Sequence, residues 1–554
     1  MKKTTIIYAA ISAVFILAVL LNVFTSPKTL ERGDNYYSIL GAKDMLKYHL
    51  QPMGDYDLFQ QKSNALLNHP PLYVYMWGII FLIFKNPIAI NLTGVIFLIL
   101  AGLMVVKIIK LSVREIKESS LIIAYALFLS IPLIIQAGYL IDLDVILPLI
   151  MLLFVYSYLK NPKAIVLNSL LFALLWFTKL QGIPMMVAAI FFYLLITKKG
   201  WKDYLNAAMI VFAGTAIFFI LLYGYSYLMH ADILKIFAHS SAESILLKQL
   251  TDMKKAFLTS AWAAKQMIIW ISPFLILLYV ISLISNLKKE FINKHQKFLL
   301  PVLVSIFALL ELIPIGTYGW NFPKYYVGFV PFMIISISPL IDKIKINKKD
   351  IWKILALLGI LVIYFLIIPD PFIPKVSEAF TQKDYLSLAS QVLFQFDLLI
   401  APLILVLLFY GRKMDKNKLI KILVILGLVV SLSIAVMQIT KPYSTNNMYG
   451  DSHSDLIATL SYLKNNTNST DVALLFAHVG YYFGNSNNTN WYNSMLCYNS
   501  EDCMKNITEN PKVKFMQFYP KDLERIDGKL KEIVGREFDY DREFGEYVIY
   551  KRKV

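Results

Sequence analysis

Long apolar runs separated by short polar segments fill the chain from its start to about residue 440. A helix of roughly 20 apolar residues crosses the hydrocarbon core of a membrane, so each run predicts a transmembrane span. No small-residue cleavage site follows the first run, which we therefore interpret as an uncleaved span and not as a signal peptide. Residues 1–440 are predicted to form an all-α, polytopic membrane domain of about 13 transmembrane helices, at Ile6–Phe24, Ile88–Val106, Leu121–Leu140, Val145–Tyr158, Ile165–Gly182, Pro184–Ile196, Tyr204–Leu228, Met267–Ile284, Phe298–Ile315, Val327–Ile341, Ile351–Ile368, Val392–Tyr410 and Leu419–Ile439.

The polar segments alternate in charge. Every second one carries a cluster of basic residues, as in Lys107–Lys117 and Lys343–Lys349. Such clusters are typical of cytoplasmic loops, which places the N-terminus, with Lys2 and Lys3, in the cytoplasm. The alternation holds only if the short apolar run Pro71–Phe84 does not cross, so we predict an interfacial helix there. The last span then leaves the C-terminus outside the cytoplasm, in a multi-pass protein of the cell membrane.

Residues 441–554 have a different, less apolar pattern and predict a soluble, extracytoplasmic α/β domain. Its polar composition includes the four Asn-x-Ser/Thr sequons at Asn465, Asn468, Asn487 and Asn506. Helical spacing and alternation predict helices at Leu456–Leu463 and Asp522–Val534, with strands at Val472–Phe476, Lys514–Tyr519 and Glu546–Tyr550.

Both cysteines of the chain, Cys497 and Cys503, lie in an Asn-rich part of this tail that we interpret as a loop. Their spacing suits a disulfide in an external compartment, and two free thiols in the cytoplasm are the alternative. Because the span count puts the tail outside, we expect the disulfide.

The composition agrees with a membrane protein, with 57% hydrophobic and 16% charged residues. A net charge of +17 would suggest nucleic-acid binding in a soluble protein, but here short basic loops account for it. We therefore expect the lipid bilayer, and not a nucleic acid, as a partner. Walker, dinucleotide-binding and HExxH motifs are absent, so ATP-driven transport and zinc proteolysis lack support.

Ionisable residues that could carry chemistry gather on the predicted outer face. The first loop, residues 27–72, carries Arg32, Asp34, Asn35 and Tyr37, and it ends in His69-Pro70-Pro71-Leu72. Further along the chain, at outer span ends, lie Asp142, Asp144, Lys179 and the dipeptide Lys324-Tyr325.

Charged groups at membrane depth are costly and are functional candidates by default. Each has a simpler alternative as well: Asp34 as an ordinary loop carboxylate, His69 as a helix cap, and the lysines Lys179 and Lys324 as groups that reach the lipid headgroups. Asp142 and Asp144 are harder to explain in this way, because they stand in a short turn between two apolar spans.

The combination of carboxylates and cations suits displacement at a carbon that carries a phosphate leaving group. A carboxylate would accept the proton of the attacking group, and cations would neutralise the departing phosphate. Asp34, Asp142 and Asp144 could also hold a divalent metal through oxygen, although no cofactor is required by the sequence.

Five elements, in this order over residues 1–340, resemble the integral-membrane glycosyltransferases of the GT-C class. They are Asp34 with Tyr37, Ala42 and Met45; His69-Pro70-Pro71-Leu72; Asp142 or Asp144; Phe177-Thr178-Lys179; and Lys324-Tyr325. The chain is similar in this respect to protein O-mannosyltransferases and to the aminoarabinose transferases that modify lipid A. Two departures are Asn35, where those families carry Glu, and Asn91, in a region where they often carry Arg.

The resemblance implies an inverting transfer of a hexose or pentose from a polyprenyl-phosphate donor to a protein, lipid or glycan on the outer face. It implies catalytic roles for Asp34 and for Asp142 or Asp144. Arg32, His69, Lys179 and Lys324 would bind the donor phosphate, and Asn35, Tyr37 and Tyr325 would position substrates. A lipid or sugar transporter, a flippase, and a ligase or polymerase of lipid-linked glycans are the alternatives. Neither internal repeats nor carboxylates at span centres support a transporter.

Overall fold

The computed structural model describes residues 3–25, 87–139, 143–180, 182–229, 270–317, 323–345, 347–367 and 415–440 of the predicted membrane domain. In the tail it describes 453–468, 470–475, 490–493, 501–518, 528–545 and 547–553, and a few short helical or single positions lie between these ranges. The chain divides into two compact units, a helical bundle and a C-terminal domain. The boundary predicted at residue 440 is followed by residues outside these ranges and stays a prediction.

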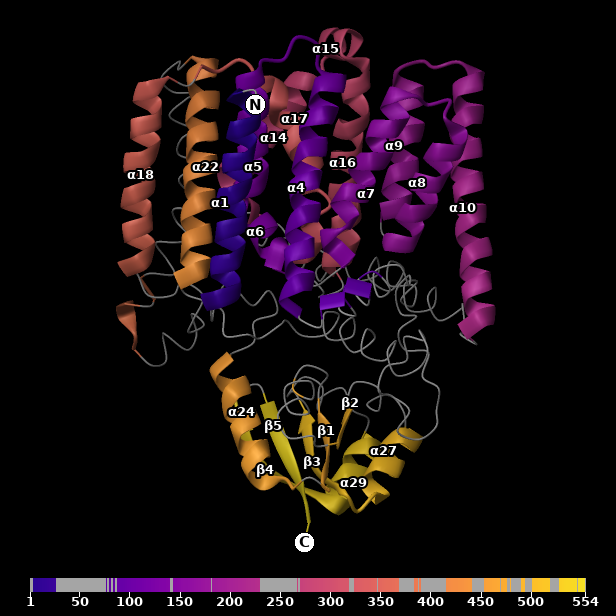
Figure 1. Ribbon diagram of the computed structural model, residues 1–554, viewed down its shortest axis with the longest axis vertical. Coiled ribbons are helices and arrows are strands. Elements are labelled where there is room, and N and C mark those ends of the chain that lie inside the picture. Colours follow the sequence, from indigo (N-terminus) through magenta and orange to yellow (C-terminus); the bar gives the residue numbers. More distant parts are fainter. Residues whose placement is uncertain are drawn as a thin grey trace. The chain divides into compact units, whose positions relative to one another are not determined.

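The bundle consists of helices that run along one common direction (Figure 1). Each predicted span within the described ranges corresponds to a helix, or to a helix pair in one case. The elements are α1 (Lys3–Thr25), α4 (Pro87–Ser112), α5 (Glu118–Ser130), α6 (Pro132–Tyr139), η3 (Leu143–Val145), α7 (Leu147–Lys160), α8 (Ile165–Thr178), α9 (Gly182–Ile196), α10 (Trp201–Met229), α14 (Pro273–Asn286), α15 (Lys289–Lys294), η5 (Gln296–Phe298), α16 (Leu299–Thr317), η6 (Pro323–Tyr326), α17 (Val330–Ile341), α18 (Lys348–Ile367) and α22 (Lys416–Thr440).

Several of these helices are long and apolar enough to cross a membrane. Among the described residues, α1, α4, α10 and α22 meet this criterion, and the bent pair α5 and α6 adds a fifth span if counted as one. The chain is therefore a multi-pass membrane protein. The number of about 13 spans stays a prediction. The span Val392–Tyr410 and most of the interfacial helix Pro71–Phe84 lie outside the described residues.

Helix α17 forms the centre of the bundle. Every residue from Val330 to Ile341 is buried, and α17 packs against α5, α14, α16 and α22. The peripheral helices show the opposite pattern, since Phe212 on α10 and Ile367 on α18 are each 77% exposed. Large apolar side chains at such exposure are expected where a helix faces lipid instead of water.

Polar side chains join the central helices. The side-chain amide of Asn286 on α14 donates to the Ser282 hydroxyl at 2.7 Å and to the Ser336 carbonyl on α17 at 3.0 Å. The hydroxyls of Tyr279 and Ser305 lie 2.8 Å apart and connect α14 to α16. In a membrane such bonds contribute about 0.6 kcal/mol each. They also satisfy polar groups that no water would reach.

The predicted span Leu121–Leu140 is not one straight helix. It breaks at Ile131, and the axes of α5 and α6 differ by 64°. Pro132 causes the break, because a residue that precedes proline avoids the helical conformation and proline itself has no N–H to donate. Ile131 is accordingly extended, with φ −63° and ψ 128°.

The C-terminal domain is a five-stranded sheet with helices on both faces. Its strand order is β2-β1-β3-β5-β4, parallel over β2, β1 and β3 and antiparallel over β3, β5 and β4. The elements are α24 (His453–Asn466), β1 (Val472–Leu475), β2 (Asn490–Asn493), α27 (Glu501–Glu509), β3 (Val513–Phe518), α29 (Gly528–Glu537), β4 (Phe538–Phe544) and β5 (Tyr547–Arg552).

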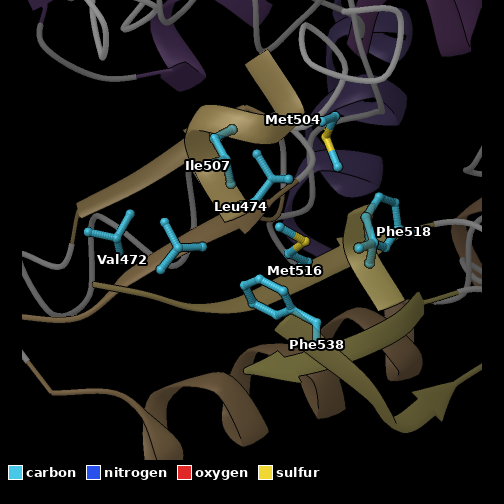
Figure 2. Packing of buried hydrophobic residues seen from close by; sticks show 9 residues of the cluster. Val472, Leu474, Met504, Ile507, Met516, Phe518 and Phe538 are labelled. Atoms are coloured by element: carbon cyan, nitrogen blue, oxygen red, sulfur yellow. The ribbon is translucent and has the colours of Figure 1, made fainter. Parts of the chain in front are cut away.

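Apolar side chains alternate between the two faces of the sheet. On β1, Leu474 packs with Met504 and Ile507 of α27 on one face, as Figure 2 shows. Its neighbour Leu475 packs with Leu460 of α24 on the other face. The period of two along a strand produces these two cores, and the helices cover them.

The predicted tail elements compare well with this domain. Helices α24 and α29 and strands β1, β3 and β5 overlap predicted elements, whereas α27, β2 and β4 were not predicted. Residues 522–527 of the helix predicted at Asp522–Val534 lie outside the described residues. Strand β4 is an edge strand with mostly exposed, charged residues, so it lacks the apolar alternation of a central strand. Cys503 lies on α27 and not in a loop, which corrects that prediction. Cys497 lies outside the described residues, and the disulfide stays a prediction.

Candidate functional site

Three short helices bring charged residues to one level inside the bundle. Helices α7, α8 and α9 have 14, 14 and 15 residues. They extend only about 21–23 Å, whereas the hydrocarbon core measures about 30 Å. Figure 1 shows that α8 and α9 end well short of α10. Helices of this length are about 8 Å shorter than the hydrocarbon core, so we expect the turn between α8 and α9, and the turn before α7, to lie within membrane depth.

Lys179 occupies the turn between α8 and α9. Thr178 ends α8 and its hydroxyl donates to the Leu174 carbonyl at 2.8 Å. The Lys179 N–H still donates to the Leu175 carbonyl at 3.1 Å, but the residue itself is extended. Gly182 then begins α9. Because Lys179 is extended, its side chain is not part of the α8 surface and lies at the level where α8 ends.

Asp144 lies opposite, in the single turn η3 that precedes α7. Its Oδ1 is 2.6 Å from the Nζ of Lys179, and the two side chains are only 4% and 11% exposed. A lysine near a helix end usually extends to the lipid headgroups. Lys179 instead lies buried against a carboxylate, as the cost of an isolated charge at this depth requires.

A second lysine joins this pair from a distant part of the chain. Lys324 lies on η6 and is 2% exposed. The Nζ of Lys179 lies 4.4 Å from the centre of the Tyr325 ring, and that of Lys324 lies 5.8 Å from it. The face of an aromatic ring attracts cations at such distances, so Tyr325 holds both ammonium groups in one cluster. We refer to Asp144, Lys179, Lys324 and Tyr325 as the charged cluster.

Six of the residues that the sequence suggested for the site lie outside the described residues. They are Arg32, Asp34, Asn35, Tyr37, His69 and Asp142. The sequence placed Asp144, Lys179 and Lys324 on one face, and the structure brings these three together. The sequence did not predict the ion pair between Asp144 and Lys179. The signal that could have done so is the short length of the apolar runs before Lys179 and after Asp144, which places both charges at one depth.

A metal site is not assembled by the described residues, among which no three His, Cys, Asp or Glu side chains come together. Of the carboxylates proposed for a metal, only Asp144 is described, and its Oδ1 contacts Lys179. An ammonium group at that oxygen competes with a cation. The metal therefore stays a prediction that depends on Asp34 and Asp142.

The fold agrees with that of known proteins over nearly its whole length. The structure of ArnT from Cupriavidus metallidurans bound to undecaprenyl phosphate matches with a TM-score of 0.54 and 13% identity, covering 97% of each chain. The chain has a GT-C fold. The apo structure of ArnT from the same organism matches with a TM-score of 0.52 and 12% identity over 97% of each chain.

A weaker likeness extends to the oligosaccharyltransferase of Archaeoglobus fulgidus, at a TM-score of 0.46 and 12% identity, over 100% of this chain and 74% of that one. No protein-family model and no curated protein matches the sequence. The GT-C resemblance expected from the five sequence elements is confirmed at the level of the fold.

Proposed function

We propose that this GT-C protein is a membrane glycosyltransferase that transfers a sugar from a polyprenyl-phosphate donor to an acceptor on the extracytoplasmic face. The observation that carries the proposal is the charged cluster, with two buried lysines from distant segments at one depth. The likeness to ArnT, which was solved with undecaprenyl phosphate, supports a donor of this class.

The depth of the cluster favours a lipid-linked donor. Lys179 and Lys324 lie among apolar helices and are nearly inaccessible. A donor whose tail lies in the bilayer can present its phosphate from within the membrane, whereas a water-soluble nucleotide sugar would have to leave water. Two ammonium groups can then form charge-assisted hydrogen bonds to the phosphate oxygens.

Each member of the cluster has a proposed task. Lys179 and Lys324 stabilise the negative charge that the phosphate gains as its bond to the sugar breaks. Asp144 orients the ammonium group of Lys179, which is a positioning role and not that of a base. Tyr325 fixes the spacing of the two ammonium groups through its ring.

The base is proposed to come from the first outer loop. Asp34 would accept the proton of the acceptor's hydroxyl or amine as that group attacks the anomeric carbon. The carbon–oxygen bond to the phosphate breaks on the opposite side, which inverts the configuration. Arg32 and His69 would add positive charge near the phosphate, while Asn35 and Tyr37 would position the sugar or acceptor.

A direct test uses the purified protein in lipid nanodiscs with a panel of polyprenyl-phosphate sugars labelled in the sugar. Release of free polyprenyl phosphate with transfer of the label to an acceptor or to water supports the proposal, and nucleotide sugars serve as the negative control. A flippase would move the intact donor across a vesicle membrane without breaking it. That result, with no donor cleaved, contradicts the proposal.

A further inference from the structure

A cavity of about 360 Å³ lies between α1, α4 and α7. Its volume falls in the range of small-molecule sites, roughly 300–1,000 Å³. None of its lining residues belongs to the charged cluster. Most of its wall is apolar, formed by Leu100, Leu103, Met104, Val106, Leu149 and Leu153, and the polar groups that line it are Tyr8, Lys107 and Lys110.

The two lysines lie toward one end of the cavity. Lys107 and Lys110 are in the last turns of α4, close to Ser112, where the chain enters a basic loop. Leu100 precedes Lys110 by ten residues, or about 15 Å along a helix. Half of the hydrocarbon core is also about 15 Å, so the cavity spans about one leaflet. The lysines at one end suit the charged headgroup of a lipid molecule, and the apolar wall below them suits one of its acyl chains.

The lysines that line the cavity can bind an anion. Lys107 is exposed and makes no ion pair with any residue that the structure describes. Lys110 contacts Glu118 at 3.1 Å, but both side chains are exposed, at 51% and 44%, so the pair is weak and open to competition. The Tyr8 hydroxyl is buried and lies beside the Glu118 carboxylate, so a lipid oxygen would compete with Glu118 for its hydrogen bond.

We propose that this cavity binds one anionic phospholipid from the leaflet at the basic end of the bundle. Lys107 and Lys110 bind the headgroup phosphate, the Tyr8 hydroxyl donates to a headgroup or ester oxygen, and an acyl chain lies along α4 and α7. The positive-inside pattern makes this the cytoplasmic leaflet, whose anionic lipids attract lysines near the surface. The site is separate from the proposed donor site at the opposite end.

Native mass spectrometry of the detergent-purified protein, titrated with phosphatidylglycerol or phosphatidylcholine of identical acyl chains, tests the proposal. We expect the anionic lipid to bind about tenfold more tightly or better. Lys107→Gln combined with Lys110→Gln should remove this preference. Lys198→Gln combined with Lys199→Gln changes two lysines at the same end but outside the cavity, and it should keep the preference.

Two further variants separate a built site from general contact with lipid. Glu118→Gln should strengthen binding of phosphatidylglycerol, because it releases Lys110. Leu103→Trp should weaken binding of both lipids, because it fills the cavity without a change in charge. Equal affinity of the wild type for both lipids, or an equal loss in both lysine pairs, would show bulk lipid only and overturn the proposal. Unfolding temperatures of the variants serve to exclude misfolded protein.

Discussion

The ammonium group of Lys179 lies 2.6 Å from the carboxylate of Asp144, a residue 35 positions earlier in the chain. Both side chains are buried at membrane depth, so each removes the cost of the other's charge. The stability of the bundle and the proposed chemistry therefore depend on the same contact. Measurements of stability must accompany every measurement of activity at this site.

Loss of one partner should destabilise the protein strongly. Asp144→Asn leaves the Lys179 charge buried without its carboxylate, which costs about 3–5 kcal/mol. We expect a lower unfolding temperature in detergent than for the wild type. The double variant Asp144→Asn/Lys179→Met removes both charges and should recover part of the loss. As a control, Lys110→Met breaks an exposed pair and should cost less than about 1 kcal/mol. Lys179→Met alone completes the comparison. If the double variant loses as much stability as the two single variants lose together, the two side chains do not stabilise one another.

Removal of the Tyr325 ring should weaken donor binding. The ring holds the ammonium groups of Lys179 and Lys324 through cation–π contacts, which contribute about 0.5–2 kcal/mol. Tyr325→Leu should raise the KM for the donor by roughly 2–30-fold, with little change in the unfolding temperature. Tyr325→Phe keeps the ring face and should remain near the wild type in KM. If both substitutions have equal effects, the ring does not order the lysines.

Asp34→Asn tests the base. Asparagine keeps the shape of the side chain but cannot take a proton, so turnover should fall by roughly 10²–10⁴-fold while donor binding persists. Asn35→Ala should be milder, since the amide cannot ionise. Single-turnover assays with labelled donor, together with a binding measurement, separate these effects. Turnover within about threefold of the wild type, with chemistry rate-limiting, would exclude Asp34 as the base.

His295 should make stability depend on pH. Its Nδ1 accepts a hydrogen bond from the Arg114 N–H at 3.3 Å, and burial, followed by the charges of Lys294 and Arg114, lowers its pKa from 6.5. The unfolded chain therefore takes up a proton at a higher pH than the folded one does. Stability should fall as pH decreases through 6.5 toward the lowered pKa and level off below it.

His295→Asn provides the matched comparison. Its side-chain oxygen can replace Nδ1 as the acceptor but does not titrate. Unfolding temperatures of wild type and variant, measured between pH 5 and 8, should agree near pH 8 and diverge toward the acidic end, where His295 lowers the stability of the wild type only. An unchanged pH profile in the variant would mean that another group causes the dependence.

Gly214 should be intolerant of a side chain. A Cβ at this position on α10 would lie 2.8 Å from the Ser169 carbonyl oxygen and 2.9 Å from Phe172 of α8. Gly214→Ala should therefore separate the two helices and cost about 1–3 kcal/mol. Gly224→Ala on the same helix meets no atom within 4 Å and should be neutral or slightly stabilising. Thermal unfolding of the two variants in the same detergent gives the comparison, and equal stabilities would show that α8 and α10 can adjust.

Much of the architecture could be predicted because membrane insertion depends on local properties of the chain. Each span requires a run of apolar residues long enough for the hydrocarbon core, and each terminal turn carries its own charges. Prediction was weaker where structure depends on packing. The break at Pro132 was visible as a residue type, but its consequence for the span was not predicted, and β4 lacks an apolar face because it lies at the edge of its sheet.

By itself, the sequence determined that the chain is a multi-pass membrane protein with an α/β domain near its C-terminus, and it predicted which ionisable residues lie at span ends. It also identified Asp144, Lys179, Lys324 and Tyr325 as candidates. Only the tertiary structure decided that Asp144 and Lys179 form a buried pair and that Tyr325 holds both lysines. Lateral position around a bundle depends on which helices pack together, and that depends on small residues and polar contacts spread over the whole chain. No local pattern encodes it, whereas depth in the membrane follows from the length of each apolar run.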